Sequence, residues 1–156
     1  MDTQHVYRIV LIDDSRMARL GLREQLNRTA EFRIVGEATS MAEGLELVQR
    51  LTPDLVLLDI SLPDGSGVEA CRRLVAGRPD TRVLILSVYD ESAVIREAVA
   101  AGAQGYVLKD TPVAMWRNAM RRVAGGGAVL GPQLIGQVLM EVREMANGLS
   151  TACMAD

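Results

Sequence analysis

Five short apolar runs alternate with five segments of helical periodicity over the first 125 residues, and this alternation constrains the fold more than any other feature. The runs are rich in Val, Ile and Leu, as expected of buried strands, and they are Tyr7–Ile12, Phe32–Ala38, Leu55–Leu58, Arg82–Leu86 and Gly105–Leu108. The helical segments are Ser15–Arg28, Met41–Leu51, Ser66–Ala76, Glu91–Ala101 and one that Thr111-Pro112 opens. Strands that alternate with helices form a parallel sheet covered on both faces. We therefore predict an α/β fold, a flavodoxin-like, doubly wound sheet of five strands in the order 2-1-3-4-5 within a three-layer α/β/α sandwich.

Composition limits the partners that such a sandwich can have. The net charge of −3 and the aromatic content of 3% argue against nucleic acid as a direct partner of these residues. No apolar run approaches the roughly 18 residues of a membrane span, and the N-terminus lacks the pattern of a signal peptide. Cys71 and Cys153 have no metal-like spacing. We expect reduced thiols and a cytoplasmic location, with no membrane partner.

Reactive side chains follow four of the five predicted strands. Asp13 and Asp14 follow the first strand, Asp59 the third, Ser87 the fourth and Lys109 the fifth. In a sheet of the predicted order these positions meet at one edge, where ligands bind in such folds. Three carboxylates repel one another unless a cation lies among them, and hard oxygen ligands suit Mg²⁺. With the lysine and the hydroxyl they form a clamp for a phosphoryl group, beside a carboxylate nucleophile at Asp59.

Each of these residues also has an ordinary structural explanation. Asp14 could cap the following helix, Ser87 could form a turn, and Lys109 could be a solvated loop residue. Asp59 could likewise be a turn former after its strand. The convergence of four strand ends on one chemistry favours the phosphoryl site over these separate explanations.

The same residues, with Leu62-Pro63-Asp64-Gly65 and the run Ala-Gly-Ala-Gln-Gly-Tyr-Val-Leu-Lys at 101–109, resemble the receiver domain of bacterial two-component response regulators. The resemblance covers about residues 6–125. The Gly-Tyr-Val-Leu-Lys-Asp run and the later Val-Ala-Gly-Gly-Gly and Leu-Gly-Pro are most similar to the NarL/FixJ (LuxR-type) subfamily. A helix-turn-helix domain normally follows in that subfamily, and we expect it to be absent from this chain.

The resemblance implies a role for each site residue. Asp59 accepts a phosphoryl group from a phosphohistidine of a sensor histidine kinase. Asp14 and Asp59 ligate Mg²⁺ directly, Asp13 acts mostly through water, and Ser61 supplies its backbone carbonyl. Lys109 contacts the phosphoryl oxygens.

The resemblance also implies a conformational switch. Ser87 donates its hydroxyl to the phosphorylated aspartate, and Tyr106 rotates inward as Ser87 moves. Ser61 and Tyr89 occupy positions that modulate the hydrolysis rate in the family. The alternative for Tyr106 is an ordinary aromatic on an edge strand. The chain would be no enzyme beyond its own phosphorylation and slow autodephosphorylation.

Other functions fit less well. A haloacid-dehalogenase-like phosphatase also uses an aspartyl nucleophile and Mg²⁺, but it needs a second Asp where this chain has Ser61, and a cap that this chain has no room for. The segment Gly65–Ala70 matches a dinucleotide fingerprint, although its glycines do not follow the strand directly. His5 lies near the terminus and not on a helix face, so we expect it to be inert. A stand-alone receiver that acts through protein contacts remains an alternative.

The triple glycine Gly125–Gly127 marks the predicted domain boundary. We expect a receiver over 6–125 and a linker over 126–156, with an amphipathic helix at about 131–147 and a frayed C-terminus. The apolar stripe of this helix is Leu134, Ile135, Val138, Leu139, Val142 and Met145. It either packs on its own domain or forms an interdomain linker, with a homodimer on phosphorylation as a further expectation. Because Arg143 is the one basic residue of the tail, DNA would be contacted only through the missing domain.

Overall fold

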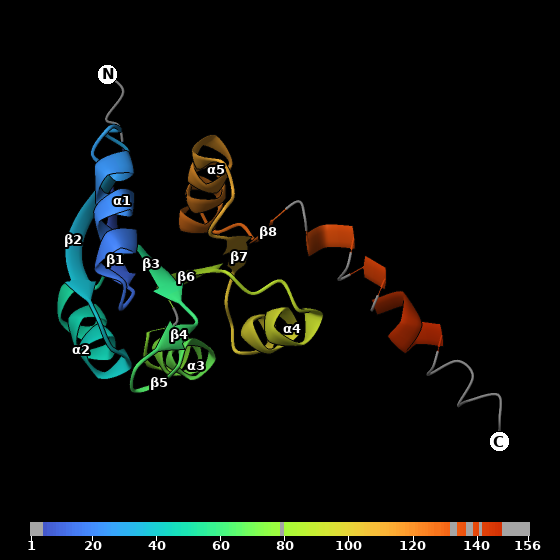
Figure 1. The fold of residues 1–156 in the computed structure, drawn as a ribbon. Helices are drawn as coiled ribbons and strands as arrows, with labels where there is room; N and C mark the ends of the chain where they lie inside the picture. Colours follow the sequence, from blue (N-terminus) through green and yellow to red (C-terminus); the bar gives the residue numbers. More distant parts are fainter. Residues whose placement is uncertain (1–4, 79, 132–133, 137–138, 141, 148–156) are drawn as a thin grey trace.

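The computed structural model describes residues 5–78, 80–131, 134–136, 139–140 and 142–147. Within them, parallel strands form a six-stranded sheet in the order β2-β1-β3-β6-β7-β8 (Figure 1). The strands are β1 (Tyr7–Ile12), β2 (Phe32–Ala38), β3 (Leu55–Asp59), β6 (Arg82–Ser87), β7 (Gly105–Leu108) and β8 (Val129–Leu130). A small antiparallel ribbon of β4 (Ser61–Leu62) and β5 (Gly65–Ser66) follows β3.

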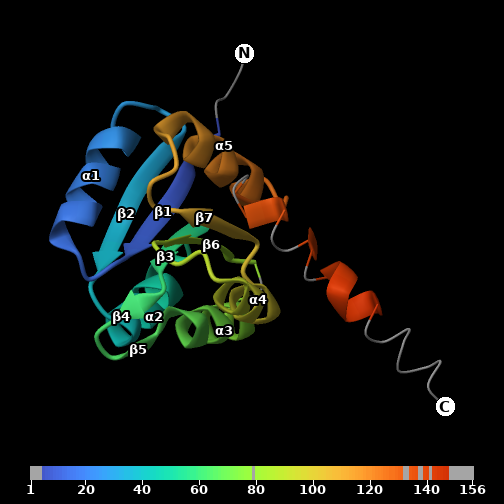
Figure 2. The same ribbon diagram turned by 45° about the vertical axis from the view of Figure 1, so that its right-hand side comes forward.

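Helices cover both faces of the sheet, as Figures 1 and 2 show. They are α1 (Arg16–Leu26), α2 (Met41–Leu51), α3 (Gly67–Gly77), α4 (Ser92–Ala100) and α5 (Val113–Ala124). One core lies between the sheet and α1 with α5, and the other lies between the sheet and α2, α3 and α4. The predicted α/β/α sandwich and its strand order 2-1-3-4-5 are confirmed. No helix in the described part of the chain is long and apolar enough to cross a membrane.

The central strand β3 shows why the strands read as unbroken apolar runs. Leu55 and Leu57 contribute to the core under α1 and α5, whereas Val56 and Leu58 contribute to the opposite core. All four side chains are at most 2% exposed. A strand covered on both faces has no solvent side, so polar residues do not alternate with apolar ones.

Serine side chains fix the starts of three helices. Ser15 accepts a hydrogen bond from the Ala18 amide, and Ser40 caps α2 through the amide of Glu43. Ser66 caps α3 in the same way. At the start of α4, Glu91 holds the cap position and makes no side-chain hydrogen bond there.

The predicted sheet was one strand short. After the triple glycine, Val129 and Leu130 pair with Gly105 and Tyr106 and add β8 beyond β7. A two-residue strand is too short to show an apolar run or a period. Consequently β7 lies inside the sheet, and the alternative explanation of Tyr106 as an edge-strand aromatic is wrong.

The chain beyond β8 packs on the domain at its start and then leaves it. Leu134 is completely buried in the core under α2, α3 and α4. The described segments 134–136, 139–140 and 142–147 are helical and lead away from the domain (Figures 1 and 2). The rest of the predicted stripe is exposed at its described positions, which are Ile135, Leu139, Val142 and Met145. Val138 and the predicted frayed end over 149–156 lie outside the described residues.

Candidate functional site

The strand ends bring three acidic side chains and one lysine together. Asp13 and Asp14 follow β1, Asp59 ends β3 and Lys109 follows β7. The Lys109 Nζ atom lies 3.0 Å from Asp13 Oδ2 and 3.3 Å from Asp59 Oδ2. Ser87 ends β6, between β3 and β7, and its carbonyl accepts the Lys109 amide at 2.8 Å. The parallel topology therefore assembles residues that are up to 96 positions apart in the sequence.

Burial and neighbouring charges set the protonation of this site. Asp59 is 8% exposed and Asp13 is 4% exposed. Burial raises the pKa of Asp59, and the negative charge of Asp13 raises it further, while Lys109 opposes both effects. For Lys109, burial disfavours the charged form, but the hydrogen bond to Asp13 and the charge of Asp59 outweigh it, so its pKa is raised. Lys109 therefore stays protonated. The Asp59 carboxylate, whose negative charge is disfavoured by burial and by Asp13, would be stabilised by a further cation.

The acidic residues fit a divalent metal ion. Asp13, Asp14 and Asp59 each offer one carboxylate oxygen, and these oxygens lie within 4.8 Å of one another. One ammonium group cannot neutralise three carboxylates. Oxygen ligands, with Asp14 exposed to solvent, match the preference of Mg²⁺ for carboxylates and retained water. The amide of Ser61 donates to Asp59 Oδ1 at 3.3 Å, whereas the role of its carbonyl as a ligand remains an expectation from the family resemblance.

Tyr89 connects the predicted switch residues. Its amide donates to the hydroxyl of the fully buried Ser87 at 2.9 Å, and its carbonyl accepts the Tyr106 hydroxyl at 2.7 Å. Its own hydroxyl accepts a hydrogen bond from the Ser61 side chain at 3.2 Å. One loop residue therefore contacts Ser87, Tyr106 and the segment after Asp59. The sequence indicated Tyr89 only as a rate-modulating position, because contacts made by a loop leave no periodic pattern.

The Tyr106 ring is already inside the protein in this structure. It is 0% exposed, and burial raises the pKa of its hydroxyl. The Tyr106 ring therefore lies inward while the Ser87 hydroxyl still accepts a hydrogen bond from the Tyr89 amide.

The structure gives ordinary explanations for the dinucleotide-like segment and for His5. In the segment Gly65–Ala70, a Cβ atom on Gly67 would lie 2.3 Å from the Asp59 carbonyl oxygen, so the glycine allows α3 to start against the end of β3. This close approach accounts for Gly67 without a nucleotide. His5 is exposed and makes an edge contact with Tyr7, at the end of β1 opposite to the acidic site.

Asp64, in the loop between β4 and β5, hydrogen-bonds to the N-terminus of α2 and is not part of the acidic cluster. Its carboxylate accepts the amides of Ala42 and Met41 at 3.0 Å and 2.7 Å. These hydrogen bonds lower the pKa of Asp64. The loop after Asp59 is thereby fixed to the N-terminus of a neighbouring helix.

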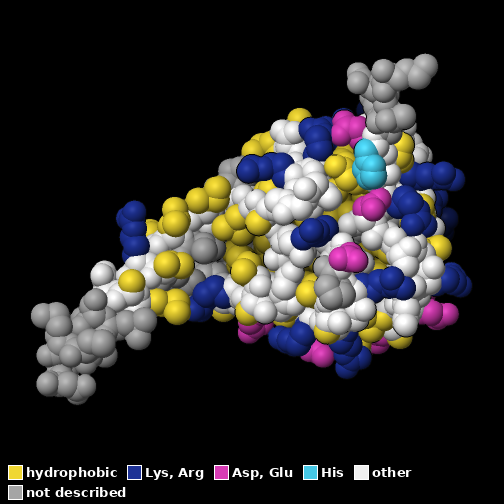
Figure 3. All heavy atoms as spheres, turned by 180° about the vertical axis from the view of Figure 1, so that it is seen from behind, with side chains coloured by type: hydrophobic (Ala, Val, Ile, Leu, Met, Phe, Trp, Pro, Cys, Tyr) yellow, Lys and Arg dark blue, Asp and Glu magenta, His cyan; other side chains and the backbone are white. Residues whose placement is uncertain are grey.

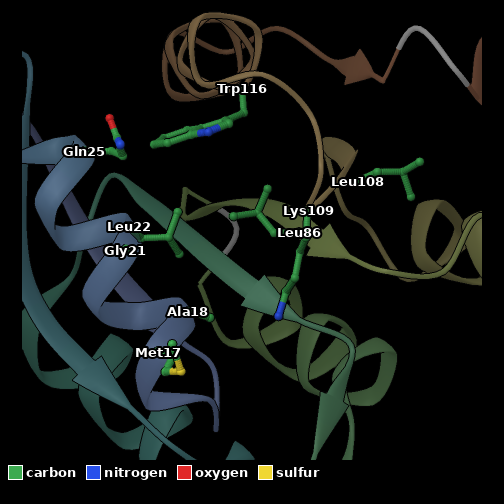
Figure 4. Close-up of a pocket in the computed structure, with 9 residues that line it drawn as sticks. All are labelled: Met17, Ala18, Gly21, Leu22, Gln25, Leu86, Leu108, Lys109 and Trp116. Atoms are coloured by element: carbon green, nitrogen blue, oxygen red, sulfur yellow. The ribbon is translucent and has the colours of Figure 1, made fainter.

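An apolar groove lies beside the acidic site, between α1 and α5 (Figure 4). Its volume is about 290 Å³, and its lining residues are Met17, Ala18, Gly21, Leu22, Gln25, Leu86, Leu108, Lys109 and Trp116. In Figure 4 the Lys109 side chain reaches from the groove toward the end of β3. Met17 is 84% exposed at the groove's rim. The groove and the acidic site therefore share a residue and form one continuous surface.

Known proteins share this fold and sequence pattern. Residues 9–121 match the family model described as "Response regulator receiver domain". The chain is 35% identical over 139 residues to transcriptional regulatory protein DegU of Brevibacillus brevis, covering 89% of this chain and 59% of that protein. It is 37% identical over 139 residues to the DNA-binding transcriptional activator DevR/DosR of Mycobacterium tuberculosis, covering 89% and 64%. The chain thus spans about three-fifths of the length of these relatives.

A solved structure gives the same assignment. A two-component response regulator of the LuxR family from Aurantimonas sp. SI85-9A1 superposes with a TM-score of 0.83 at 32% identity, covering 87% of this chain and 97% of that chain. The chain belongs to the response regulator receiver domain family, with homologues among the LuxR/NarL-type regulators.

Proposed function

We propose that this chain is the phosphoacceptor of a two-component phosphorelay, in which Asp59 receives a phosphoryl group from a phosphohistidine of a sensor histidine kinase. The observation that carries the proposal is the Lys109 ammonium, which lies within 3.3 Å of Asp59 and 3.0 Å of Asp13 inside a three-carboxylate cluster. Together with a divalent cation held by these carboxylates, this lysine would supply the positive charge that the transfer needs.

The chain's own residues would carry out the transfer. A carboxylate oxygen of Asp59 attacks phosphorus, the bond between phosphorus and the histidine nitrogen breaks, and an acyl phosphate forms on Asp59. Lys109 is placed to contact the transferred oxygens. Asp14 and Asp59, with Asp13 acting mostly through water and the Ser61 carbonyl, would hold Mg²⁺, which supplies charge neutralisation to the phosphoryl oxygens. The chain would catalyse only this step and a slow hydrolysis of its own acyl phosphate.

The switch would use the contacts of Tyr89. The Ser87 hydroxyl must leave the Tyr89 amide to bind a phosphoryl oxygen on Asp59. Because the Tyr89 carbonyl holds the Tyr106 hydroxyl, a shift of this loop changes the contact that fixes the ring. Phosphorylation adds about −1.5 to −2 charge, which gives Ser87 and Lys109 a partner in only one state.

The groove between α1 and α5 supports kinase docking. A phosphohistidine can reach Asp59 only if its protein lies across the adjacent surface, and the groove shares Lys109 with the site. The exposed Met17 at its rim suits the apolar face of a helix. For output, we propose control of transcription, in the cytoplasm, through a DNA-binding domain that is not among these 156 residues, with homodimerisation on phosphorylation.

A small phosphodonor tests the central step. With acetyl phosphate and Mg²⁺, mass spectrometry should show one added phosphoryl group, which Asp59→Ala abolishes and the exposed neighbour variant Asp110→Ala retains. A chelator should suppress labelling. Labelling that survives Asp59→Ala would overturn the proposed phosphoacceptor, and labelling that survives the chelator would overturn the requirement for Mg²⁺.

A further inference from the structure

A second groove lies on the opposite side of α5 from α1, along the edge strand β8. Its volume is about 230 Å³, and its lining residues are Val107, Thr111, Met115, Asn118, Ala119, Arg122, Val129, Leu130, Gly131 and Ile135. The residues that α5 contributes recur at helical spacing, so they follow one face of that helix. Met115 is 42% exposed, and the buried Thr111 hydroxyl has no hydrogen-bond partner within the described residues. We call this surface the α5/β8 groove.

The helical segments after residue 134, which we call the arm, start at the rim of this groove. Ile135 lines the groove, and Leu134 beside it is completely buried. Farther along the arm, Leu139 is 53% exposed and Val142 is 55% exposed. Figure 3 shows hydrophobic side chains along the arm that continue onto the body of the molecule. A row of exposed apolar side chains of this kind favours burial against another surface.

The arm cannot cover its own groove by the path that it takes. It leaves the domain at Leu134 and runs outward, away from α5 (Figures 1 and 2). Farther out, Arg96 Nη1 on α4 donates to Met145 Sδ at 3.9 Å, so this part of the arm lies against α4. Leu139 and Val142 could reach the groove of the same chain only if the helix reversed direction within a few residues.

We propose that two copies of this chain exchange arms, so that the apolar face of each arm packs in the α5/β8 groove of the other copy. The groove and the face that would fill it are on the same chain, and a two-fold axis uses each of them twice. The charges are also complementary. Arg122 at the groove has no ion-pair partner among the described residues, and Glu144 is exposed on the arm. The dimer is present before phosphorylation, which would strengthen it, and it uses a surface away from Asp59, so its failure would leave the proposed phosphoacceptor role of Asp59 intact.

Sedimentation velocity over a concentration series tests the dimer with the unphosphorylated chain of 156 residues. The wild type should associate, and either Leu139→Glu or Met115→Glu should raise the dimer dissociation constant by about 30-fold or more, with unchanged circular dichroism. The matched control is Leu20→Glu on α1, which is 47% exposed and should leave association unchanged. A chain that stays monomeric at all concentrations, or a dimer that only Leu20→Glu dissociates, would overturn the proposal.

Charge reversal tests the register between the two copies. Arg122→Glu and Glu144→Arg should each weaken association, and the double variant should recover it because the pair is restored with opposite polarity. Single variants that weaken association without recovery in the double variant would remove this pair from the interface.

Disulfide trapping tests where the arm binds. In a Cys153→Ser background, chains with Met115→Cys and chains with Leu139→Cys are mixed and exposed to oxidised glutathione. Arm exchange predicts a disulfide between the two different variants, each tagged by mass. Cross-links that join two Leu139→Cys chains instead would show that the arms pair with each other, and this outcome would overturn the groove as their binding site.

Discussion

At the scale of single residues, Gly67 shows how the backbone around the phosphoacceptor is constrained. A Cβ atom at this position would meet the Asp59 carbonyl oxygen at 2.3 Å and the Ile60 Cα at 2.5 Å, and neither backbone atom can move freely. We expect Gly67→Ala to lower the free energy of unfolding by more than about 2 kcal/mol, measured by urea denaturation.

The matched control for Gly67 is Gly21 in α1, where an added Cβ would have no atom within 4 Å. Gly21→Ala should stabilise the protein by about 0.5–1 kcal/mol, because it removes backbone freedom from the unfolded chain and adds a better helix former. Equal effects at the two positions would contradict the steric explanation.

Cys71 gives a second prediction at this scale. It is completely buried in α3, and burial raises the pKa of its thiol to about 11. At pH 8 only about one thiol in a thousand is then ionised, and it has no access to solvent. In a Cys153→Ser background, native protein should resist alkylation by iodoacetamide, and modification should follow the unfolding transition in urea. Alkylation of the native protein at the rate of a free thiol would contradict this assignment.

At the scale of elements, the loop between β6 and α4 joins the site to the switch through Tyr89. Removing its hydroxyl in Tyr89→Phe breaks the 3.2 Å contact with Ser61 while leaving the backbone contacts in place. A neutral hydrogen bond is worth about 1 kcal/mol, so we expect the rate of phosphoryl loss from Asp59 to rise by about fivefold, measured by the decay of labelled protein.

A double-mutant cycle tests whether that contact is responsible. Ser61→Ala should have the same effect as Tyr89→Phe, and the double variant should add little to either. Tyr7→Phe, at the far end of β1, serves as the control. Fully additive effects of the two single changes would show that the hydrogen bond between them does not hold the loop.

At the scale of the whole molecule, the chain after the triple glycine has one part that packs on the domain and one part that is exposed. Val129 and Leu130 add β8 to the sheet and Leu134 is buried, whereas the described positions farther on are exposed. A chain that ends at residue 127 should lose about 2–5 kcal/mol of stability, because the core loses a fully buried leucine and β7 loses its neighbour.

A chain that ends at residue 136 provides the comparison. Compared at concentrations where the chain is monomeric, it should lie within about 0.5 kcal/mol of the full chain in urea denaturation. Equal destabilisation by both truncations would mean that the arm supports its own domain.

The sequence by itself determined the α/β/α sandwich, the first five strands and the strand ends that carry Asp13, Asp59, Ser87 and Lys109. These features depend on local patterns: apolar runs, helix caps, and residues that follow a run directly. Parallel connections then place such residues at one edge of the sheet, which is why separate strand ends could be combined into one site before any distance was known.

Only the tertiary structure decided the features that depend on non-local packing. The two residues of β8 are a strand because β7 offers them hydrogen bonds, and their sequence alone carries no period. Tyr89 gains its three contacts because the ends of β3, β6 and β7 lie side by side. Of the predicted apolar stripe, only Leu134 reaches the core among the described positions, because the arm turns away from the domain after it. Periodicity shows which face of a helix is apolar, but it does not show which surface of the protein covers that face.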